Sequence, residues 1–330
     1  MQKIINVIFR IDIDTGLKAG TGHLARSLTI KNEIFLNRNK YRCFFLFKDL
    51  NQSKKLISKY QKKDLIIYNN NFKEKLKFIS KNDIFIFDTP FGIDNRMKKF
   101  IENKKCIKTL LIDDVNKPNL NKAIIFNGIK YLKKKLTNKK NKIFQGTKYI
   151  LLNKIFAKHK SVNLKNEILI GSGGTDKKHN LIKIINVVKK LKDLKFLVIV
   201  GEAVDKNNPV NKIKCSNIRL LKKKKNLYKY YLRVKGCILS GGIMMFESLA
   251  LGKKTFVLET YKHQKKSIDF FEKKKLVIKI GVDNKLYKNK LLMGLNKIQN
   301  INTSSKNKYI DGKALLRLKK IINREFLSNV

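Results

Sequence analysis

The sequence predicts an α/β protein of two domains, each built on a parallel sheet with helices on both faces. The chain has 330 residues, which is long for a single hydrophobic core. Short, continuously apolar segments alternate with helical patterns, as expected for buried parallel strands and the helices that connect them. This alternation starts again after an irregular, lysine-rich region. We therefore expect two domains, at residues 1–158 and 159–330.

The first domain is predicted to open on an apolar strand at Ile4–Phe9, a helix at Leu24–Leu36 and a second strand at Cys43–Phe47. This order makes a βαβ unit. The later part of the domain is expected to contain strands at 65–68, 84–88, 109–113 and 148–153, and lysine-rich helices at 72–80 and 95–103.

The second domain is predicted to repeat the same kind of architecture. We expect its strands at 167–170, 196–200, 217–221, 236–240 and 255–258. Two helices are expected to follow glycine-rich turns, at His179–Leu191 and at Ile243–Leu251.

The loop after the first strand contains Gly20, Gly22 and His23. Glycines allow a tight bend and the close approach of a substrate. Open α/β sheets bind their ligands at the carboxyl ends of their strands, which is where His23 is expected. A single histidine is more often packed or capping than catalytic, so both interpretations of His23 stay open on placement alone.

Three carboxylates are expected beside His23. Asp88 ends one predicted strand, and Asp113 ends another and is followed by Asp114. Each of them could simply cap a helix or shape a turn. Together they could orient the imidazole of His23 and raise its basicity, although the sequence does not tell which of them does so.

Two glycine-rich turns follow strands of the second domain, at Gly171–Asp176 and at Ser240–Gly242. Backbone N–H groups in such turns, at the start of a helix, form anion sites. Two of them in one domain suit a nucleotide diphosphate. Glu247 follows the second turn and could accept hydrogen bonds from a ribose, or it could be a first-turn residue that favours the helix dipole.

The formal charge of +52 comes from 67 lysines and nine arginines, against 24 acidic residues. Because the lysines are spread along the chain and arginine is scarce, we expect a solvated lysine surface and no specific nucleic-acid partner. A protein that binds nucleic acid or another polyanion is the alternative.

The four cysteines form no CxxC pair and have no histidine at ligand spacing, which favours reduced thiols and no metal site. No signal peptide and no apolar run of membrane-spanning length is visible. We therefore expect a cytoplasmic monomer that needs no cofactor and makes at most peripheral membrane contact.

Several motifs resemble one family along nearly the whole chain: GTGHLARSLTI from Gly20, LLIDD from Leu110, YILL from Tyr149, GSGGTD from Gly171, and the block from Ser240 to Gln264. They occur in the same order in the UDP-2,4-diacetamido-2,4,6-trideoxy-β-L-altropyranose hydrolases of pseudaminic acid biosynthesis. That family is related to the spore-coat polysaccharide proteins and to the lipid II glycosyltransferase. The resemblance implies the B-type glycosyltransferase fold, in which two Rossmann-like domains face a cleft.

The resemblance also implies an activity, the hydrolysis of a UDP-linked sugar to UDP and the free sugar, with His23 as the general base. The residues implied on the sugar side are Arg10, Asp12, Gly20, Gly22, Arg26, Asp88, Asp113 and Asp114. Those implied to bind UDP are Gly173, Gly174, Thr175, Ser240, Gly241, Gly242, Glu247, His263 and Gln264. No metal is implied, because helix N-termini can stabilise the departing diphosphate.

The chain departs from the family pattern at two places on the sugar side. Thr15–Lys18 are inserted before the glycines, and Asn153 stands where many relatives carry an arginine. A glycosyltransferase that uses the same cleft, with His23 deprotonating an acceptor hydroxyl, is the main alternative. The first domain shows no clear amphipathic membrane stretch, which favours hydrolysis over transfer to a lipid acceptor.

Overall fold

The computed structural model describes residues 4–11, 22–47, 64–67, 71–89, 93–104, 108–112, 120, 122–128, 141–158, 162–176, 178–201, 204–222, 226–282, 285–298 and 308–327. The chain divides into two compact units. The first is Met1–Asn153 together with Lys313–Val330, and the second is Lys154–Gly312.

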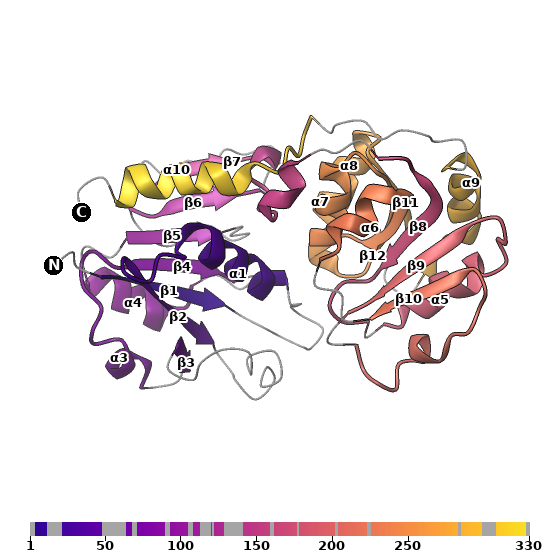
Figure 1. Cartoon of the computed structure of the whole chain (residues 1–330). Helices are drawn as coiled ribbons and strands as arrows, with labels where there is room; N and C mark the ends of the chain where they lie inside the picture. Colours follow the sequence, from indigo (N-terminus) through magenta and orange to yellow (C-terminus); the bar gives the residue numbers. More distant parts are fainter. Residues whose placement is uncertain are drawn as a thin grey trace. The chain divides into compact units, whose positions relative to one another are not determined.

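The first unit is built on a parallel sheet in the order β3-β2-β1-β4-β5-β6-β7. Its strands are β1 (Ile5–Ile11), β2 (Tyr41–Phe47), β3 (Leu65–Ile67), β4 (Ile84–Asp88), β5 (Lys108–Ile112), β6 (Ile124–Asn127) and β7 (Lys142–Gln145). Its helices are α1 (Gly22–Ile34), α3 (Phe72–Lys75), α4 (Asn95–Asn103), α10 (Ala314–Phe326) and the 3-10 turn η2 (Thr147–Tyr149). Figure 1 shows this unit with α1 and α10 labelled beside the sheet.

Alternate residues of the central strand β1 enter two separate cores. Val7 and Phe9 pack in one core with residues of α1 and α10, whereas Ile8 packs in the other with residues of α3 and α4. Because both faces of the strand are covered, its sequence is continuously apolar rather than alternating. The helices therefore lie on both faces of the sheet, as predicted.

The second unit contains another sheet, in the order β10-β9-β8-β11-β12-β13-β14, in which only the pairing of β13 with β14 is antiparallel. Its strands are β8 (Lys165–Gly171), β9 (Lys195–Val200), β10 (Ile218–Lys222), β11 (Val234–Ser240), β12 (Lys254–Glu259), β13 (Val277–Val282) and β14 (Lys285–Leu286). Its helices are α5 (Asn180–Val188), α6 (Tyr228–Arg233), α7 (Ile243–Ala250), α8 (Lys265–Lys273) and α9 (Lys288–Ile298), with 3-10 turns η3 (Lys154–Ala157), η4 (Pro209–Lys212) and η5 (Lys262–Gln264).

Helices again lie on both faces of this sheet. Residues of α5 and α9 share one core with Ile168 and Ile238, while α6, α7 and α8 lie on the opposite side in Figure 1. The central strands β8 and β11 are neighbours, with Gly171 paired to Leu239. Their carboxyl ends therefore bring the two glycine-rich turns to the same edge.

Two expectations differ from the structure. The whole of 159–330 was expected in one domain, but α10 returns to the first unit because its buried stripe, which includes Leu318 and Ile322, completes the core around Val7. The strand expected at 148–153 is wrong. Thr147–Tyr149 form η2 instead, and the following Ile150–Leu152 are buried outside the sheet.

Candidate functional site

His23 and Asp88 meet at the carboxyl edge of the first sheet. His23 is the second residue of α1, and Asp88 is the last residue of β4, paired with Ile11 at the end of β1. His23 Nδ1 lies 2.6 Å from Asp88 Oδ1. The carboxylate is completely buried, whereas the His23 side chain is 21% exposed. The imidazole therefore joins a buried carboxylate to the surface of the unit.

Asp88 has further partners on the same helix. Arg26 donates from Nε to Asp88 Oδ2 at 2.8 Å and from Nη2 to Oδ1, and Ser27 Oγ lies 3.3 Å from Oδ2. His23 and Arg26 are three residues apart, so they share one face of α1. Burial raises the pKa of the Asp88 carboxyl, but the charges and hydrogen bonds of Arg26 and His23 outweigh burial and lower it to about 2. Asp88 is therefore ionised at any physiological pH.

An ionised Asp88 decides the tautomer of neutral His23. A carboxylate only accepts hydrogen bonds, so Nδ1 carries the proton that is shared with Asp88. Nε2 then has an unprotonated lone pair. Such an imidazole, oriented by a buried carboxylate, is able to take a proton from a bound water or hydroxyl group.

The other residues expected on the sugar side are only partly described. Arg10 is buried near the end of β1, where it donates to the carbonyl oxygen of Ile11 at 3.1 Å. Gly22 is the first residue of α1. Four further candidates, Asp12, Gly20, Asp113 and Asp114, lie outside the described residues. Of the three carboxylates considered as support for His23, the structure shows Asp88 in contact with it.

In the second unit, the turn after β8 leads into α5. The N-cap of this helix is His179, and the carboxylate of Asp176, three residues earlier, accepts from the backbone N–H groups of Asn180 at 2.9 Å and Leu181 at 3.3 Å. Burial raises the pKa of the Asp176 carboxyl in spite of these hydrogen bonds. Gly173 has a φ of +94°, a conformation that favours glycine. The sequence placed Asp176 in the turn but did not identify it as an acceptor for the first N–H groups of α5.

The second turn lies directly beside the first. A Cβ atom added to Gly173 would lie 3.7 Å from Ser240 Oγ, at the end of β11. Gly242 is the N-cap of α7. Thr175 is buried in the first turn. The two glycine turns therefore lie side by side, and the start of α7 supplies backbone donors for an anion.

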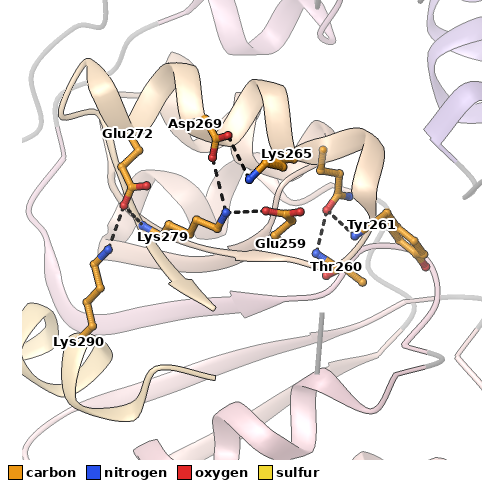
Figure 2. Close-up of polar contacts among 9 residues, drawn as sticks. Glu259, Thr260, Tyr261, Lys265, Asp269, Glu272, Lys279 and Lys290 are labelled. Atoms are coloured by element: carbon orange, nitrogen blue, oxygen red, sulfur yellow. Dashed lines mark hydrogen bonds and ion pairs between the residues drawn. The ribbon is translucent and has the colours of Figure 1, made fainter. Parts of the chain in front are cut away.

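A third loop, after β12, also reaches this edge (Figure 2). Gln264 Oε1 accepts from the backbone N–H groups of Thr260 at 3.1 Å and Tyr261 at 3.3 Å. Its Nε2 faces Gly242, where it would lie 3.8 Å from an added Cβ. His263 is exposed and stacks on Tyr261, with ring centroids 5.6 Å apart. Gln264 thus stabilises its own loop and directs a donor group at the second glycine turn.

A group of ion pairs lies behind this loop (Figure 2). Lys279 on β13 contacts Glu259, the last residue of β12, at 2.6 Å, and Asp269 on α8 at 3.5 Å. Lys290 on α9 contacts Glu272 at 3.0 Å. Through its contacts with Glu259 and Asp269, Lys279 holds the end of β12 to α8. Nothing in the sequence pattern distinguishes Lys279 from its many lysine neighbours.

Glu247 is the fifth residue of α7, and α7 has no acidic residue in its first turn. The alternative in which Glu247 merely favours the helix dipole is therefore not supported. The side chain is half-buried, and the hydroxyl of Tyr231 on α6 donates to the carbonyl oxygen of Met244, one turn earlier on α7, at 3.2 Å. Burial raises the pKa of the Glu247 carboxyl to about 7, although the Tyr231 hydroxyl acts to lower it.

The described part of the chain contains no cluster of three or more histidine, cysteine or acidic side chains able to hold a metal ion. Among the same residues, no helix is long and apolar enough to cross a membrane.

No family model matches the chain. An uncharacterized protein of Methanocaldococcus jannaschii is 29% identical over 281 residues, which cover 79% of this chain and 57% of the relative. The chain thus spans little more than half the length of that relative. The spore coat polysaccharide biosynthesis protein SpsG of Bacillus subtilis is 21% identical over 284 residues, 82% of each chain, which indicates distant homology.

Solved structures show the fold. The UDP-GlcNAc 2-epimerase of Methanocaldococcus jannaschii, in complex with UDP-GlcNAc and UDP, matches with a TM-score of 0.55 at 12% identity, over 97% of this chain and 100% of that chain. MurG of Acinetobacter baumannii matches with a TM-score of 0.56 at 12% identity, over 97% and 99%. The predicted B-type glycosyltransferase fold, with two Rossmann-like domains, is confirmed.

Proposed function

We infer that the protein hydrolyses a UDP-linked diacetamido-trideoxy sugar to UDP and the free sugar, in nonulosonate biosynthesis of the pseudaminic acid type. The observation that carries the reaction is the 2.6 Å contact between His23 Nδ1 and the buried carboxylate of Asp88. A histidine that merely packs against an apolar core needs no such partner. A histidine that takes a proton during a reaction gains from it, because the carboxylate stabilises the imidazolium that forms.

The reaction that fits this arrangement is attack of water at the anomeric carbon. His23 Nε2 takes a proton from the water while the water oxygen bonds to the anomeric carbon. The bond between that carbon and the diphosphate oxygen breaks, and its electron pair leaves with UDP. Because the diphosphate is a good leaving group, the protein has only to position and deprotonate the water.

The second unit is assigned the UDP part of the substrate. Two features support this assignment: the glycine turns at Gly173 and Ser240–Gly242 adjoin each other, and α7 begins at the second of them. Backbone donors at a helix start suit the diphosphate. Glu247 is assigned to the ribose, because an ionised carboxylate accepts hydrogen bonds from hydroxyl groups. Gln264 Nε2, which faces Gly242, is assigned to the same ligand.

Transfer of the sugar to an acceptor hydroxyl is the second candidate function. The observation that favours it is the distant homology to a protein named for spore coat polysaccharide biosynthesis, together with the fold shared with MurG. In a transferase, His23 would deprotonate an acceptor hydroxyl in place of water, and the same residues would bind UDP.

The experiment that separates these functions is UDP release from a panel of UDP-sugars in the absence of any acceptor. The panel includes the diacetamido-trideoxy-altrose derivative, and His23→Ala is measured beside the wild type. Hydrolysis predicts free UDP and free sugar that disappear in His23→Ala. UDP binding without release until an acceptor is added would establish the transferase, and a wild type that does not bind UDP would exclude both.

A further inference from the structure

Lys178 lies between the first glycine turn and α5, and its side chain reaches the loop after β12. Its ammonium group donates to the carbonyl oxygen of Thr260 at 3.0 Å and lies 5.7 Å from the centre of the Tyr261 ring. Asn180, the first residue of α5, is buried and donates from Nδ2 to Thr260 Oγ1 at 3.4 Å. The segment that enters α5 therefore contacts Thr260 at two points.

The amide of Gln264 is oriented by the same loop. Its Oε1 accepts from the backbone N–H groups of Thr260 at 3.1 Å and Tyr261 at 3.3 Å. Because these two donors need the amide oxygen, the orientation of the amide is fixed, and Nε2 is the donor left for a ligand. Nε2 faces Gly242, and a Cβ atom added to Gly241 would lie 3.2 Å from Gln264 Cβ. The loop therefore rests against the second glycine turn and presents a donor to it.

We propose that Lys178 is a positioning residue for nucleotide binding, which holds Thr260 so that Gln264 Nε2 stays directed at the second glycine turn. This inference rests on the proposed function, in which Gln264 contacts UDP. Lys178 acts through the backbone of the loop and not on the ligand.

Lys178 and Gln264 hold opposite sides of one peptide unit. The carbonyl oxygen of Thr260 and the N–H group of Tyr261 belong to the same planar, trans group. They therefore point in opposite directions, the oxygen to Lys178 and the N–H group to Gln264 Oε1. A cation at the oxygen also polarises the peptide unit, which strengthens the hydrogen bond that its N–H group donates. Removal of Lys178 should thus loosen both the peptide plane and the amide of Gln264.

Asn180 is a weaker restraint on the same residue. Its contact of 3.4 Å is long, and Thr260 Oγ1 belongs to a side chain that can rotate without moving the backbone. Asn180 Oδ1 has no hydrogen-bond partner among the described residues. The orientation of the Thr260–Tyr261 peptide unit is therefore assigned to Lys178.

The test measures UDP dissociation constants by calorimetry, at low and at high salt. Lys178→Met removes the donor and keeps an apolar side chain, whereas Lys178→Arg keeps a charged donor. Lys189→Met is the matched control, because it removes the same charge at the other end of α5, where the exposed Lys189 contacts Asn186 Oδ1 at 3.1 Å. Each change is also made in Gln264→Ala.

We expect Lys178→Met to weaken UDP binding about fivefold, because loss of one hydrogen bond lowers the fraction of protein whose loop is ready to bind to about a fifth. In Gln264→Ala the same change should have no further effect, since the group that Lys178 positions is absent. Lys178→Arg should restore most of the affinity, and Lys189→Met should match the wild type.

Hydrogen exchange of the Tyr261 amide, followed by NMR without any ligand, tests the loop by itself. Exchange should be faster in Lys178→Met than in the wild type or in Lys189→Met, because the N–H group is held less firmly on Gln264 Oε1. Unchanged exchange in Lys178→Met would overturn the inference.

A direct contact between Lys178 and the diphosphate would give a different pattern. The loss in Lys178→Met would then be as large in Gln264→Ala as in the wild type, and it would shrink at high salt. That result would overturn the inference, while UDP binding by the wild type leaves the proposed function standing. A wild type that does not bind UDP would overturn both.

Discussion

Asp88 Oδ1 lies 2.6 Å from His23 Nδ1, and 65 positions of sequence separate the two residues. The sheet order brings them together, because β4 is hydrogen-bonded to β1 and the helix that carries His23 starts beyond the end of β1. The same carboxylate also accepts from Arg26 and Ser27 of that helix. The start of α1 is therefore held to the end of β4 by one buried side chain.

Replacing this carboxylate tests whether it serves the reaction. We expect Asp88→Asn to lower kcat for UDP release by about 10²- to 10⁴-fold, because the amide cannot stabilise the imidazolium and allows the wrong tautomer. UDP affinity should change little, since the nucleotide is assigned to the other unit. Steady-state kinetics and calorimetric UDP binding provide the two measurements.

The matched control is Asp83→Asn, at the residue directly before the start of the same strand. Asp83 is also buried, and it accepts from the backbone N–H groups of Asn6 at 2.8 Å and Ser80 at 2.7 Å. Its loss should lower stability without a selective effect on kcat. Equal losses of kcat in the two variants would show that Asp88 has only a structural role.

Asp88 should also stabilise the fold in a way that is lost in acid. Its pKa is about 2 in the folded protein, against an ordinary value of 3.8. A lowered pKa stabilises the fold above the unfolded value, and this contribution is lost as the pH falls from about 4 to about 2. The difference in unfolding free energy between wild type and Asp88→Asn should therefore shrink by about 2 kcal/mol over that interval. Urea titrations at several pH values measure it, and a constant difference would contradict the assignment.

Glu247 should have the opposite effect on stability. Its folded pKa of about 7 lies above the ordinary 4.5, so the folded state holds a proton that the unfolded state releases. The contribution of protonated Glu247 to the unfolding free energy is greatest below about pH 4.5 and is lost as the pH rises through 7. Glu247→Gln, which remains neutral, should therefore be more stable than the wild type at pH 8, by roughly 1–3 kcal/mol, and should bind UDP more weakly. Equal stability of the two proteins at pH 8 would count against a raised pKa.

Much of the fold could be predicted because buried parallel strands are short apolar runs. Four strands, β6, β7, β13 and β14, were not predicted; of these, β7 is a half-buried four-residue segment and β14 has two residues. The amphipathic pattern of α10 indicates that one face is buried but not which core receives it. The core that receives α10 is decided by the packing of Leu318 against strands of the first sheet, which are distant from it in the sequence.

Individual residues of the candidate site were predicted from the sequence, but the contacts between them were not. His23 and Asp88 were both expected at the end of a strand, but their pairing depends on which strands are neighbours. Lys279 was not identified at all. It acts through one ammonium group on a mostly buried side chain and leaves no motif, because its partners Glu259 and Asp269 are set by tertiary packing.

Gly201 offers a test of the first glycine turn. A Cβ atom at this position would lie 2.4 Å from the carbonyl oxygen of Gly174 and 2.5 Å from that of Gly173. These are backbone atoms, so Gly201→Ala must displace the turn and should weaken UDP binding by about tenfold. Gly294→Ala is the control, since its Cβ would meet the ring of Phe256 at 2.2 Å in the core. It should lower Tm and leave the UDP dissociation constant unchanged. Unchanged UDP binding in Gly201→Ala would exclude the turn from the nucleotide site.

Lys279 and Lys290 both pair with carboxylates of the second unit, but their side chains differ in exposure (Figure 2). The Lys279 side chain is 12% exposed and contacts Glu259 and Asp269, whereas the Lys290 side chain is 48% exposed and contacts Glu272. Burial lowers the pKa of Lys279, but its ion pairs outweigh burial and raise it. Its contribution is therefore complete at neutral pH and would be lost only as the pH rises above 10.5.

Lys279→Met leaves the buried Glu259 carboxylate without its cation, which should cost about 2–4 kcal/mol of unfolding free energy. Lys290→Met removes an exposed pair and should cost less than about 1 kcal/mol. Urea unfolding at pH 7 measures both. Because Glu259 directly precedes the loop that Gln264 holds against Gly242, Lys279→Met should also weaken UDP binding, while Lys290→Met should not. A Lys279→Met protein as stable as Lys290→Met would mean that the end of β12 is held by its strand pairing alone.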